Sequence, residues 1–319
     1  MPTDPLVQRA AIDVDLWMPD SEFAVFPQGA REKEALFAPD VPAPDQGFLV
    51  PGRRYLFKRS RRAYPDQFWA EVVAYRLGCL LGVNVPPAFA GVKATSGDCG
   101  AVIQWFYVDG EERFVWAGDL LQSLRPGFER ERGTDHNLAE NLALLRALRF
   151  AGTLDPNERS QLWWARALAF DALIGNTDRH QDNWGLLFRA SGEPARDVAR
   201  LAPLFDNGTS LGFERFPELV ATWTPAQLDQ YIARGQHHVR AAHGQPRQSH
   251  LALLTHVIES WPQAGAAIAT MLKDLSARDI EAQLLDLLTL NLPQPMSEQR
   301  FAFMLRLLSR RLEILKELF

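Results

Sequence analysis

A short polar cluster between an apolar helix and an apolar strand constrains this chain more than any other feature. The segment reads Phe170-Asp-Ala-Leu-Ile-Gly-Asn-Thr-Asp-Arg-His-Gln-Asp-Asn-Trp-Gly-Leu-Leu-Phe188. Its start continues a predicted helix over residues 158–173, and its end predicts a strand. The polar residues between them include Asn176, Asp178, His180 and Asn183. Because such residues also favour plain turns, a solvated turn is the alternative to a functional loop.

A second polar element follows at the end of another apolar strand, in Leu204-Phe205-Asp206-Asn-Gly208. A hairpin between the two strands would bring Asp206 beside Asn183. Mg²⁺ takes carboxylate and amide oxygens as protein ligands, with water and phosphate in the remaining positions. We therefore predict a magnesium site formed by Asn183 and Asp206.

The spacing of these residues matches the chemistry of phosphoryl transfer. Asp178 and Asn183 are as far apart as the Asp and Asn of the protein-kinase catalytic loop, H-R-D-x-x-x-x-N. In that chemistry a carboxylate accepts the proton of the attacking hydroxyl while oxygen ligands hold the metal on the phosphates. Asp178 is thus the candidate base, and Asp206 takes the place of the metal-binding Asp of D-F-G.

An upstream strand and helix supply the cation that the phosphates require. Lys58 ends the apolar run Arg54-Tyr-Leu-Phe-Lys58, and Glu71 lies inside a predicted helix over residues 66–81. Asp66 is the expected N-cap of that helix, and Gly82 is the expected C-cap. We expect Lys58 to bind the ATP phosphates and to pair with Glu71, as the strand lysine and helix glutamate do in protein kinases.

The order of predicted elements indicates an α+β fold with two lobes, like that of protein kinases. Residues 1–110 carry one helix and short strands, expected at Phe23–Phe26, Phe48–Val50, Val85–Val92 and Ala101–Val108. Residues 111–319 are mostly helical, with helices expected at 137–150 and 158–173. Residues 249–319 are also expected to be helical, with breaks at Pro262, Ser276 and Pro293. The predicted organisation is a β-rich N-terminal lobe (1–110) and a helical C-terminal lobe (111–319) that carries the catalytic loop and the metal-binding Asp.

Composition excludes several classes of protein. The net charge of −5 argues against direct nucleic-acid binding. The two cysteines, Cys79 and Cys99, form no C-x-x-C pair, which argues against a disulfide scaffold or a structural zinc site. The sequence shows no signal peptide and no apolar run of about 18 residues, so no membrane span is expected and the cytoplasm is the expected compartment.

The chain resembles the HipA-like serine/threonine kinases from about Gly29 to about Gly212. Residues 176–183 match the family pattern N-x-D-x-H-x-x-N, and Leu201–Ser210 looks like the family's strand-end metal motif. Tyr55-Leu-Phe-Lys58 is similar to the lysine strand, and Gly82-Val-Asn-Val-Pro86 is similar to the family's start of the following strand. Only about 50 residues precede Lys58, so we expect a compact member without the family's extra N-terminal subdomain.

The resemblance implies an enzyme that uses ATP and Mg²⁺ to phosphorylate a protein serine or threonine. It assigns Asp178 as catalytic base, Asn183 and Asp206 as Mg²⁺ ligands, and Lys58 as an ATP-phosphate ligand. It further implies that Asn176 and His180 brace the catalytic loop. Several such toxins pair with a DNA-binding antitoxin, so a toxin–antitoxin role is possible for this chain.

Three readings of the activity stay open. The related phosphoinositide 3/4-kinases share a similar loop, so a lipid or small-molecule kinase is the first alternative to a protein kinase. A nucleotide-binding pseudokinase that acts as a regulator is the second, although the base, the metal ligands and the lysine are all present.

Two further nucleotide contacts rest on weaker patterns. Pro27–Leu36 is the best candidate for a phosphate loop, with Gly29 as its glycine, and a plain turn is the alternative. Gln104-Trp105-Phe106 ends a predicted strand where an adenine-binding hinge would lie, with Gln104 and Phe106 as contacts. A buried strand end explains that second pattern equally simply.

A histidine-rich stretch contains His237, His238, His243 and His250. No pair of them has a tight helical ligand spacing with a carboxylate, so a metal site is disfavoured. We expect a surface loop or a loop facing the substrate.

Overall fold

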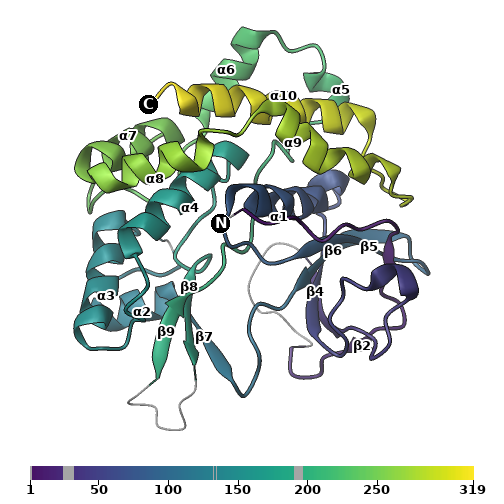
Figure 1. Cartoon of the computed structure of the whole chain (residues 1–319), viewed down its shortest axis with the longest axis horizontal. Helices are drawn as coiled ribbons and strands as arrows, with labels where there is room; N and C mark the ends of the chain where they lie inside the picture. Colours follow the sequence, from purple (N-terminus) through teal and green to yellow (C-terminus); the bar gives the residue numbers. More distant parts are fainter. Residues whose placement is uncertain (1, 24–31, 132, 134, 190–196) are drawn as a thin grey trace. The chain divides into compact units, whose positions relative to one another are not determined.

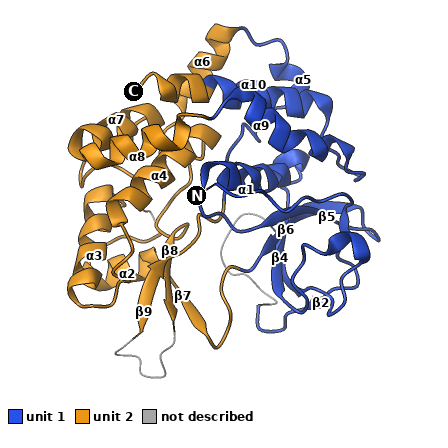
Figure 2. Ribbon diagram, in the orientation of Figure 1, with its two compact units in different colours: residues 1–105, 207–224, 275–310 blue, residues 106–206, 225–274, 311–319 orange. Residues whose placement is uncertain are grey.

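The computed structural model describes residues 2–23, 32–131, 133, 135–189 and 197–319. The chain divides into two compact units, coloured separately in Figure 2. Unit 1 comprises Met1–Trp105, Asn207–Thr224 and Leu275–Arg310, and unit 2 comprises Phe106–Asp206, Pro225–Asp274 and Arg311–Phe319. The chain therefore passes into unit 2 after Trp105 and returns to unit 1 after Asp206. The lobe boundary expected at residue 110 stays a prediction.

A mixed six-stranded sheet forms the base of unit 1. Its strands are β1 (Ile12–Asp13), β2 (Met18–Pro19), β3 (Lys33–Phe37), β4 (Arg54–Arg59), β5 (Ala88–Lys93) and β6 (Asp98–Gln104). They lie in the order β1-β5-β6-β4-β3-β2, in which β1 and β5 pair parallel and the other neighbours pair antiparallel; β2, β4, β5 and β6 are labelled in Figure 1. β4 is hydrogen-bonded on both edges, to β3 and β6, which fixes its register and that of Lys58.

One predicted strand of this region is wrong, and another falls outside the described residues. Phe48–Val50 forms a turn after the 3₁₀ helix η1 (Pro44–Gln46), because the Leu49 amide bonds back to the Gln46 carbonyl. Of the strand expected at Phe23–Phe26, residues 24–26 lie outside the part that the structure describes.

Helix α1 (Trp69–Leu81) packs against β5 and β6 and follows the 3₁₀ helix η2 (Pro65–Phe68). The predicted C-cap is confirmed, since Gly82 has φ 64°. The predicted N-cap is wrong: Pro65 starts the 3₁₀ turn one residue earlier, and the Asp66 carboxylate accepts hydrogen bonds from Gln294 and Arg300 instead.

The later segments of unit 1 are helical. They are α5 (Pro217–Val220), α9 (Ala277–Leu284), the 3₁₀ helix η4 (Leu285–Thr289) and the part of α10 (Glu298–Lys316) up to Arg310. α9 packs against α1, and Arg76 of α1 pairs with Asp286 at 2.9 Å. These contacts join the C-terminal part of the sequence to helix α1.

In the described part of the chain, unit 2 combines a three-stranded antiparallel sheet with six whole helices and the end of α10 from Arg311. The strands, in sheet order, are β7 (Glu112–Trp116), β8 (Gly185–Arg189) and β9 (Val198–Leu201). The helices are α2 (Ala117–Leu124), α3 (Leu138–Phe150), α4 (Ser160–Ile174), α6 (Pro225–Arg234), α7 (His250–Ser260) and α8 (Pro262–Leu272). α3 and α4 confirm the predicted helices, and α4 lies against α7 and α8 (Figure 1).

The histidine-rich stretch is not the expected surface loop. His237, His238 and His250 are buried in unit 2, and only His243 of the four is exposed. Within the described ranges, no group of three or more His, Cys, Asp or Glu residues is arranged to hold a metal ion. A search for membrane spans among the described helices finds none with the length and apolar character required.

Candidate active site

Lys58 and Glu71 form a buried ion pair in unit 1, as predicted. Lys58 Nζ lies 2.7 Å from Glu71 Oε1, and both side chains are about 95% buried. Lys58 comes from the central strand β4 and Glu71 from the first turn of α1. Because burying an ammonium group without a partner is strongly disfavoured, the carboxylate compensates for the burial of this lysine.

The second oxygen of Glu71 holds the chain just after Asp206. Glu71 Oε2 accepts from the Asn207 amide at 2.9 Å, and the Gln67 side chain donates to the Gly208 carbonyl at 2.9 Å. Gln67 and Glu71 are four residues apart, so they share one face across the η2–α1 junction. Lys58, Glu71 and the Asn207 main chain therefore form one chain of polar contacts.

In unit 2 the predicted catalytic loop begins where α4 ends. Gly175 caps the helix with φ 71°, a conformation that favours glycine. The next residue, Asn176, accepts from the Asp178 amide at 3.0 Å and donates to Asp171 Oδ1 at 3.2 Å. Asn176 thus fixes the main chain of Asp178 against the last turns of α4, which agrees with its expected bracing role.

Asp178 and Asn183 are joined through their own loop. Asn183 Nδ2 donates to the Asp178 carbonyl at 2.7 Å, and the amides of His180 and Asn183 continue the turn. Since the amide nitrogen of Asn183 is used in this bond, Oδ1 is the atom that the side chain can offer to a cation. Asp178 is half-buried.

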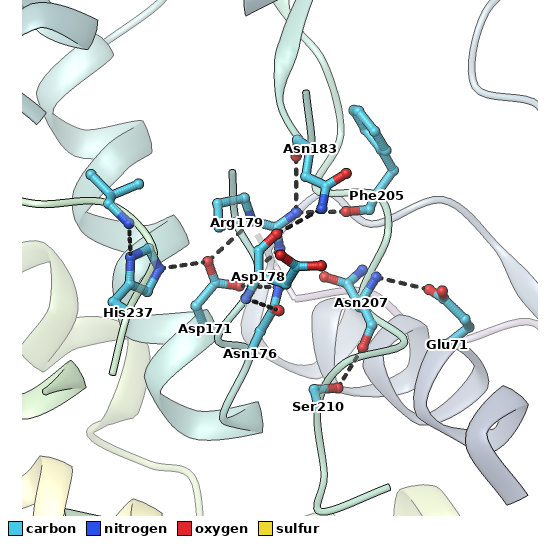
Figure 3. Close-up of polar contacts among 11 residues, drawn as sticks. Glu71, Asp171, Asn176, Asp178, Arg179, Asn183, Phe205, Asn207, Ser210 and His237 are labelled. Atoms are coloured by element: carbon cyan, nitrogen blue, oxygen red, sulfur yellow. Dashed lines mark hydrogen bonds and ion pairs between the residues drawn. The ribbon is translucent and has the colours of Figure 1, made fainter. Parts of the chain in front are cut away.

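Arg179 is fully buried and binds four oxygen atoms (Figure 3). Its Nε and Nη2 donate to both carboxylate oxygens of Asp171, at 3.1 and 2.8 Å. Its Nη1 donates to the carbonyls of Asn183 and Phe205, at 3.1 and 2.5 Å. Because both carbonyl oxygens bind one nitrogen, they lie within about 6 Å of each other.

A carboxylate inside α4 anchors this arginine. Asp171 is fully buried, and burial alone would raise its pKa; the Arg179 guanidinium and a hydrogen bond from His237 outweigh burial and hold its pKa below the ordinary value. His237 Nε2 lies 3.1 Å from Asp171 Oδ2, and its Nδ1 accepts from the Val239 amide at 3.1 Å. These contacts place the imidazole proton on Nε2 and keep Asp171 ionised.

The remaining loop residues are tied to the start of α2. His180 Nδ1 accepts from the Asp182 amide at 3.1 Å, so the His180 ring closes the turn. Arg130 Nε binds Asp182 Oδ1 at 2.9 Å, and the Gln181 side chain donates to the Arg130 carbonyl. The Gly118 amide donates to the Gln181 carbonyl at 2.9 Å, which fixes this side of the loop.

Asp206 follows the β8–β9 hairpin predicted from the sequence. β8 and β9 pair antiparallel, with Leu186 opposite Leu201. Asp206 has φ 55°, a left-handed conformation that is costly for a residue with a Cβ. Its neighbour Phe205 and Asn183 share the Arg179 nitrogen, which brings the main chains of the two candidate ligands together.

The donor set of Asn183 and Asp206 fits a magnesium ion. One carboxylate and one amide oxygen are hard ligands, and Mg²⁺ commonly takes few protein ligands and fills its other positions with water and phosphate. Neither residue offers an imidazole nitrogen or a thiolate, the ligands typical of zinc sites, so the donor set favours magnesium over zinc.

The structure places two of the three residues expected to contact the nucleotide outside the catalytic loop and the Lys58–Glu71 pair. Gln104 ends β6 and its amide donates to the Pro87 carbonyl at 2.8 Å, while Phe106 begins unit 2 and stacks on Phe205 at 5.2 Å. Gly29 lies outside the described residues. The roles of Gln104 and Phe106 in binding adenine stay predictions.

Sequence reasoning missed Asp171, Arg179 and His237. One signal was present: Asp171 is a charged residue within an otherwise apolar stretch of helix, Ala167–Ile174, and such a residue is rarely buried unless it is paired. His237 gives no comparable signal, because its partner lies 66 residues away in the sequence.

Comparison with known proteins identifies related folds. The family model described as HipA-like C-terminal domain matches residues 26–272. No curated protein matches the sequence. The solved Helicobacter pylori proinflammatory kinase CtkA is similar over 96% of this chain and 97% of its own, with a TM-score of 0.70 and 20% identity. Shewanella oneidensis MR-1 HipA, solved with HipB and its operator DNA as a toxin–antitoxin system, is similar over 93% of this chain and 66% of its own, with a TM-score of 0.53 and 15% identity.

At these identities the likeness concerns the fold. It confirms the predicted α+β fold of the protein-kinase type.

Proposed function

The chain belongs to the family of HipA-like C-terminal domains, and from this premise we propose that it is an ATP- and Mg²⁺-dependent kinase acting on serine or threonine hydroxyls of a protein. The observation that carries the proposal is the joined geometry of Asp178 and Asn183. The Asn183 amide nitrogen binds the Asp178 carbonyl at 2.7 Å, which joins a residue with a carboxylate and a residue with an amide oxygen in one short loop. That combination of base and metal ligand is what phosphoryl transfer requires.

Each residue then has a defined task. Asp178 orients the acceptor hydroxyl and takes its proton. Asn183 and Asp206 hold Mg²⁺, which when bound offsets the negative charge of the phosphates. Lys58 binds the ATP phosphates, and Glu71 keeps it in position through the 2.7 Å ion pair.

Incubation of the pure protein with γ-labelled ATP, Mg²⁺ and a mixture of proteins and peptides tests this proposal. We expect label on serine or threonine, located by mass spectrometry. Asp178→Asn should lower transfer by about 10²–10⁴-fold, because the base is lost. Asp182→Asn is the matched control: it makes the same change in the same loop, but its carboxylate is engaged by Arg130 at 2.9 Å, so most activity should remain. Full activity of Asp178→Asn would refute the assignment.

The same assay separates the alternative activities. Label on lipid headgroups or small molecules, with no protein label, would favour a kinase of the phosphoinositide-kinase type. Tight ATP binding without transfer to any acceptor, including the protein itself, would indicate a pseudokinase that acts as a regulator.

A toxin role is the second part of the proposal, and it is supported by the fold shared with HipA, which was solved with HipB and operator DNA. If this chain is a toxin whose action depends on phosphorylation, its expression should arrest growth of a bacterial host, whereas Asp178→Asn should not. Equal growth of cells that express the wild type and cells that express Asp178→Asn would argue against a toxin. Relief of the arrest by a co-expressed DNA-binding protein would identify an antitoxin.

A further inference from the structure

Resting on the proposed function, we propose that Arg179 is a positioning residue for the metal site: anchored on Asp171, it fixes the main chain of Asn183 and of Phe205–Asp206 relative to Asp178. In this role Arg179 contacts none of the reacting atoms and acts only through the residues that it binds. The oxygen atoms that it binds in Figure 3 belong to Asp171, Asn183 and Phe205, which lie in unit 2 like Arg179 itself.

The contacts of Arg179 converge on the candidate catalytic residues. It follows Asp178 in the chain, binds the carbonyl of Asn183 itself, and binds the carbonyl of Phe205, the residue before Asp206. Of the candidate residues, Asn183 is therefore bound by Arg179 directly, Asp178 is its neighbour in the chain, and Asp206 follows the bound Phe205. A shift of the guanidinium would move both metal ligands at once.

Asp171 gives the arginine a single possible orientation. Its two oxygens bind Nε and Nη2 in the two-pronged geometry of paired guanidinium and carboxylate groups. The same carboxylate also accepts from Asn176 at 3.2 Å and from His237 at 3.1 Å. Because Asn176 in turn binds the Asp178 amide, Asp171 supports the base and the metal ligands together.

A fully buried charge pair has a large desolvation cost, so its presence here needs a reason beyond stability. Replacing such a pair with apolar residues is often neutral or stabilising. A pair of leucines could fill the same space, but they could not hold two main-chain carbonyls in place. Recognition of those carbonyls is the property that requires arginine, since lysine has one nitrogen and cannot bind four oxygens in this geometry.

Arg179→Lys tests the proposal, and Arg300→Lys is its matched control. Arg300 is also buried and also joins a carboxylate to two main-chain carbonyls: Asp66 at 3.2 Å, Gly212 at 3.1 Å and Arg215 at 2.8 Å. It lies in unit 1 and touches none of the candidate catalytic residues. A purely structural arginine should therefore behave like Arg300 in both stability and activity.

The readouts are the melting temperature, Mn²⁺ affinity in the presence of ADP by electron paramagnetic resonance of free Mn²⁺, and kcat and KM for ATP. We expect both variants to lose thermal stability. Only Arg179→Lys should weaken Mn²⁺ binding, by about 10–100-fold, as loss of outer contacts to metal ligands does. Its kcat should fall by a similar factor, with a smaller change in KM.

If Arg179→Lys does not fold, His237→Asn provides the test, because it removes one support of Asp171 and leaves the arginine–carboxylate pair. A smaller loss of Mn²⁺ affinity, of several fold, is then expected. Unchanged Mn²⁺ affinity and kcat in a folded Arg179→Lys or His237→Asn variant would overturn the proposal. A different result separates this proposal from the proposed function. If the wild type transfers no phosphate but the variants bind Mn²⁺ more weakly than it does, the role of Arg179 is upheld and the kinase assignment is refuted.

Discussion

Glu71 illustrates how one side chain links two parts of the proposed site. One oxygen binds Lys58 at 2.7 Å and the other binds the Asn207 amide at 2.9 Å. Asn207 directly follows Asp206 in the chain, so Lys58 and Asp206 are connected through this carboxylate and one peptide bond. A change at Glu71 is therefore expected to affect both the proposed phosphate ligand and the proposed metal ligand.

Glu71→Gln should weaken ATP binding by about 10-fold, because the charged hydrogen bond to Lys58 is replaced by a neutral one. Calorimetric titration with ATP and Mg²⁺ measures the change. Glu34→Gln is the control: Glu34 also binds a lysine, Lys93 at 2.7 Å, but it lies partly exposed on β3. Equal effects of the two changes would show that Glu71 has no special role.

Substitutions of Asp206 allow effects on stability and on activity to be measured separately, because its φ of 55° is unfavourable for a residue with a Cβ. Asp206→Gly should remove transfer, yet its free energy of unfolding should stay within about 1 kcal/mol of wild type, since glycine accepts this conformation. Asp206→Ala also loses the carboxylate but keeps the Cβ, so it should be less stable than the glycine variant. Urea unfolding measures all three proteins. A glycine variant less stable than the alanine variant would contradict this account.

At the scale of elements, the end of α4 sets where the catalytic loop begins. Gly175 has φ 71°, and a Cβ added there would lie 2.4 Å from the guanidinium carbon of Arg311. Arg311 is itself buried and donates to the Ala172 carbonyl at 2.9 Å, so it cannot move aside without losing that bond. The helix end is thus fixed by backbone conformation and by packing.

Gly175→Ala and Gly152→Ala separate these two contributions. Gly152 has φ 72° at the end of α3, and a Cβ there would meet nothing within 4 Å. Gly152→Ala should therefore cost about 1–2 kcal/mol of unfolding free energy, from backbone conformation alone. Gly175→Ala should cost about 1–3 kcal/mol more, because the Arg311 hydrogen bond is disturbed. Equal losses in chemical denaturation would show that the contact with Arg311 is unimportant.

At the scale of the whole molecule, buried histidines determine the response to acid. Burial lowers the pKa of His238 to about 3, and nearby Arg247 and His180 add to the effect. Burial also lowers the pKa values of His136 and His250 well below the ordinary value. Since the unfolded chain binds these protons near pH 6.5, stability should fall as the pH drops below about 6.5. Asp171, with its lowered pKa, adds a further loss only below about pH 4.

His250→Leu should reduce the pH dependence of stability. Both ring nitrogens of His250 are buried without a hydrogen-bond partner in the described part of the chain, so leucine removes a group that resists protonation. Between pH 6 and pH 5 the free energy of unfolding should fall less steeply in His250→Leu than in wild type. The two slopes should differ by about 1.4 kcal/mol per pH unit, the contribution of one titrating group. His256→Leu on the same helix is the control, because the exposed ring of His256 stays in water. Identical slopes for the two variants would contradict this explanation.

The local chemistry of the site could be predicted from the sequence. The spacing of Asp178 and Asn183, the turn at Gly82 and the pairing of Lys58 with Glu71 depend on residues close in sequence or on one strand and the next helix. The ion pair, the hairpin before Asp206 and the α+β fold are confirmed. The roles of these residues in phosphoryl transfer stay predictions.

The tertiary structure alone decided what holds the site in position. Asp171 meets His237 across 66 residues, and Glu71 meets Asn207 across 136. Such pairs leave no periodic trace in the sequence, because each forms only after distant segments have packed. The same reason explains why residues 207–224 and 275–310 belong to unit 1, although the sequence pattern predicts an N-terminal lobe formed by residues 1–110 alone. The sequence by itself determined which side chains have the functional groups for the proposed reaction. Long-range packing decided where those side chains lie.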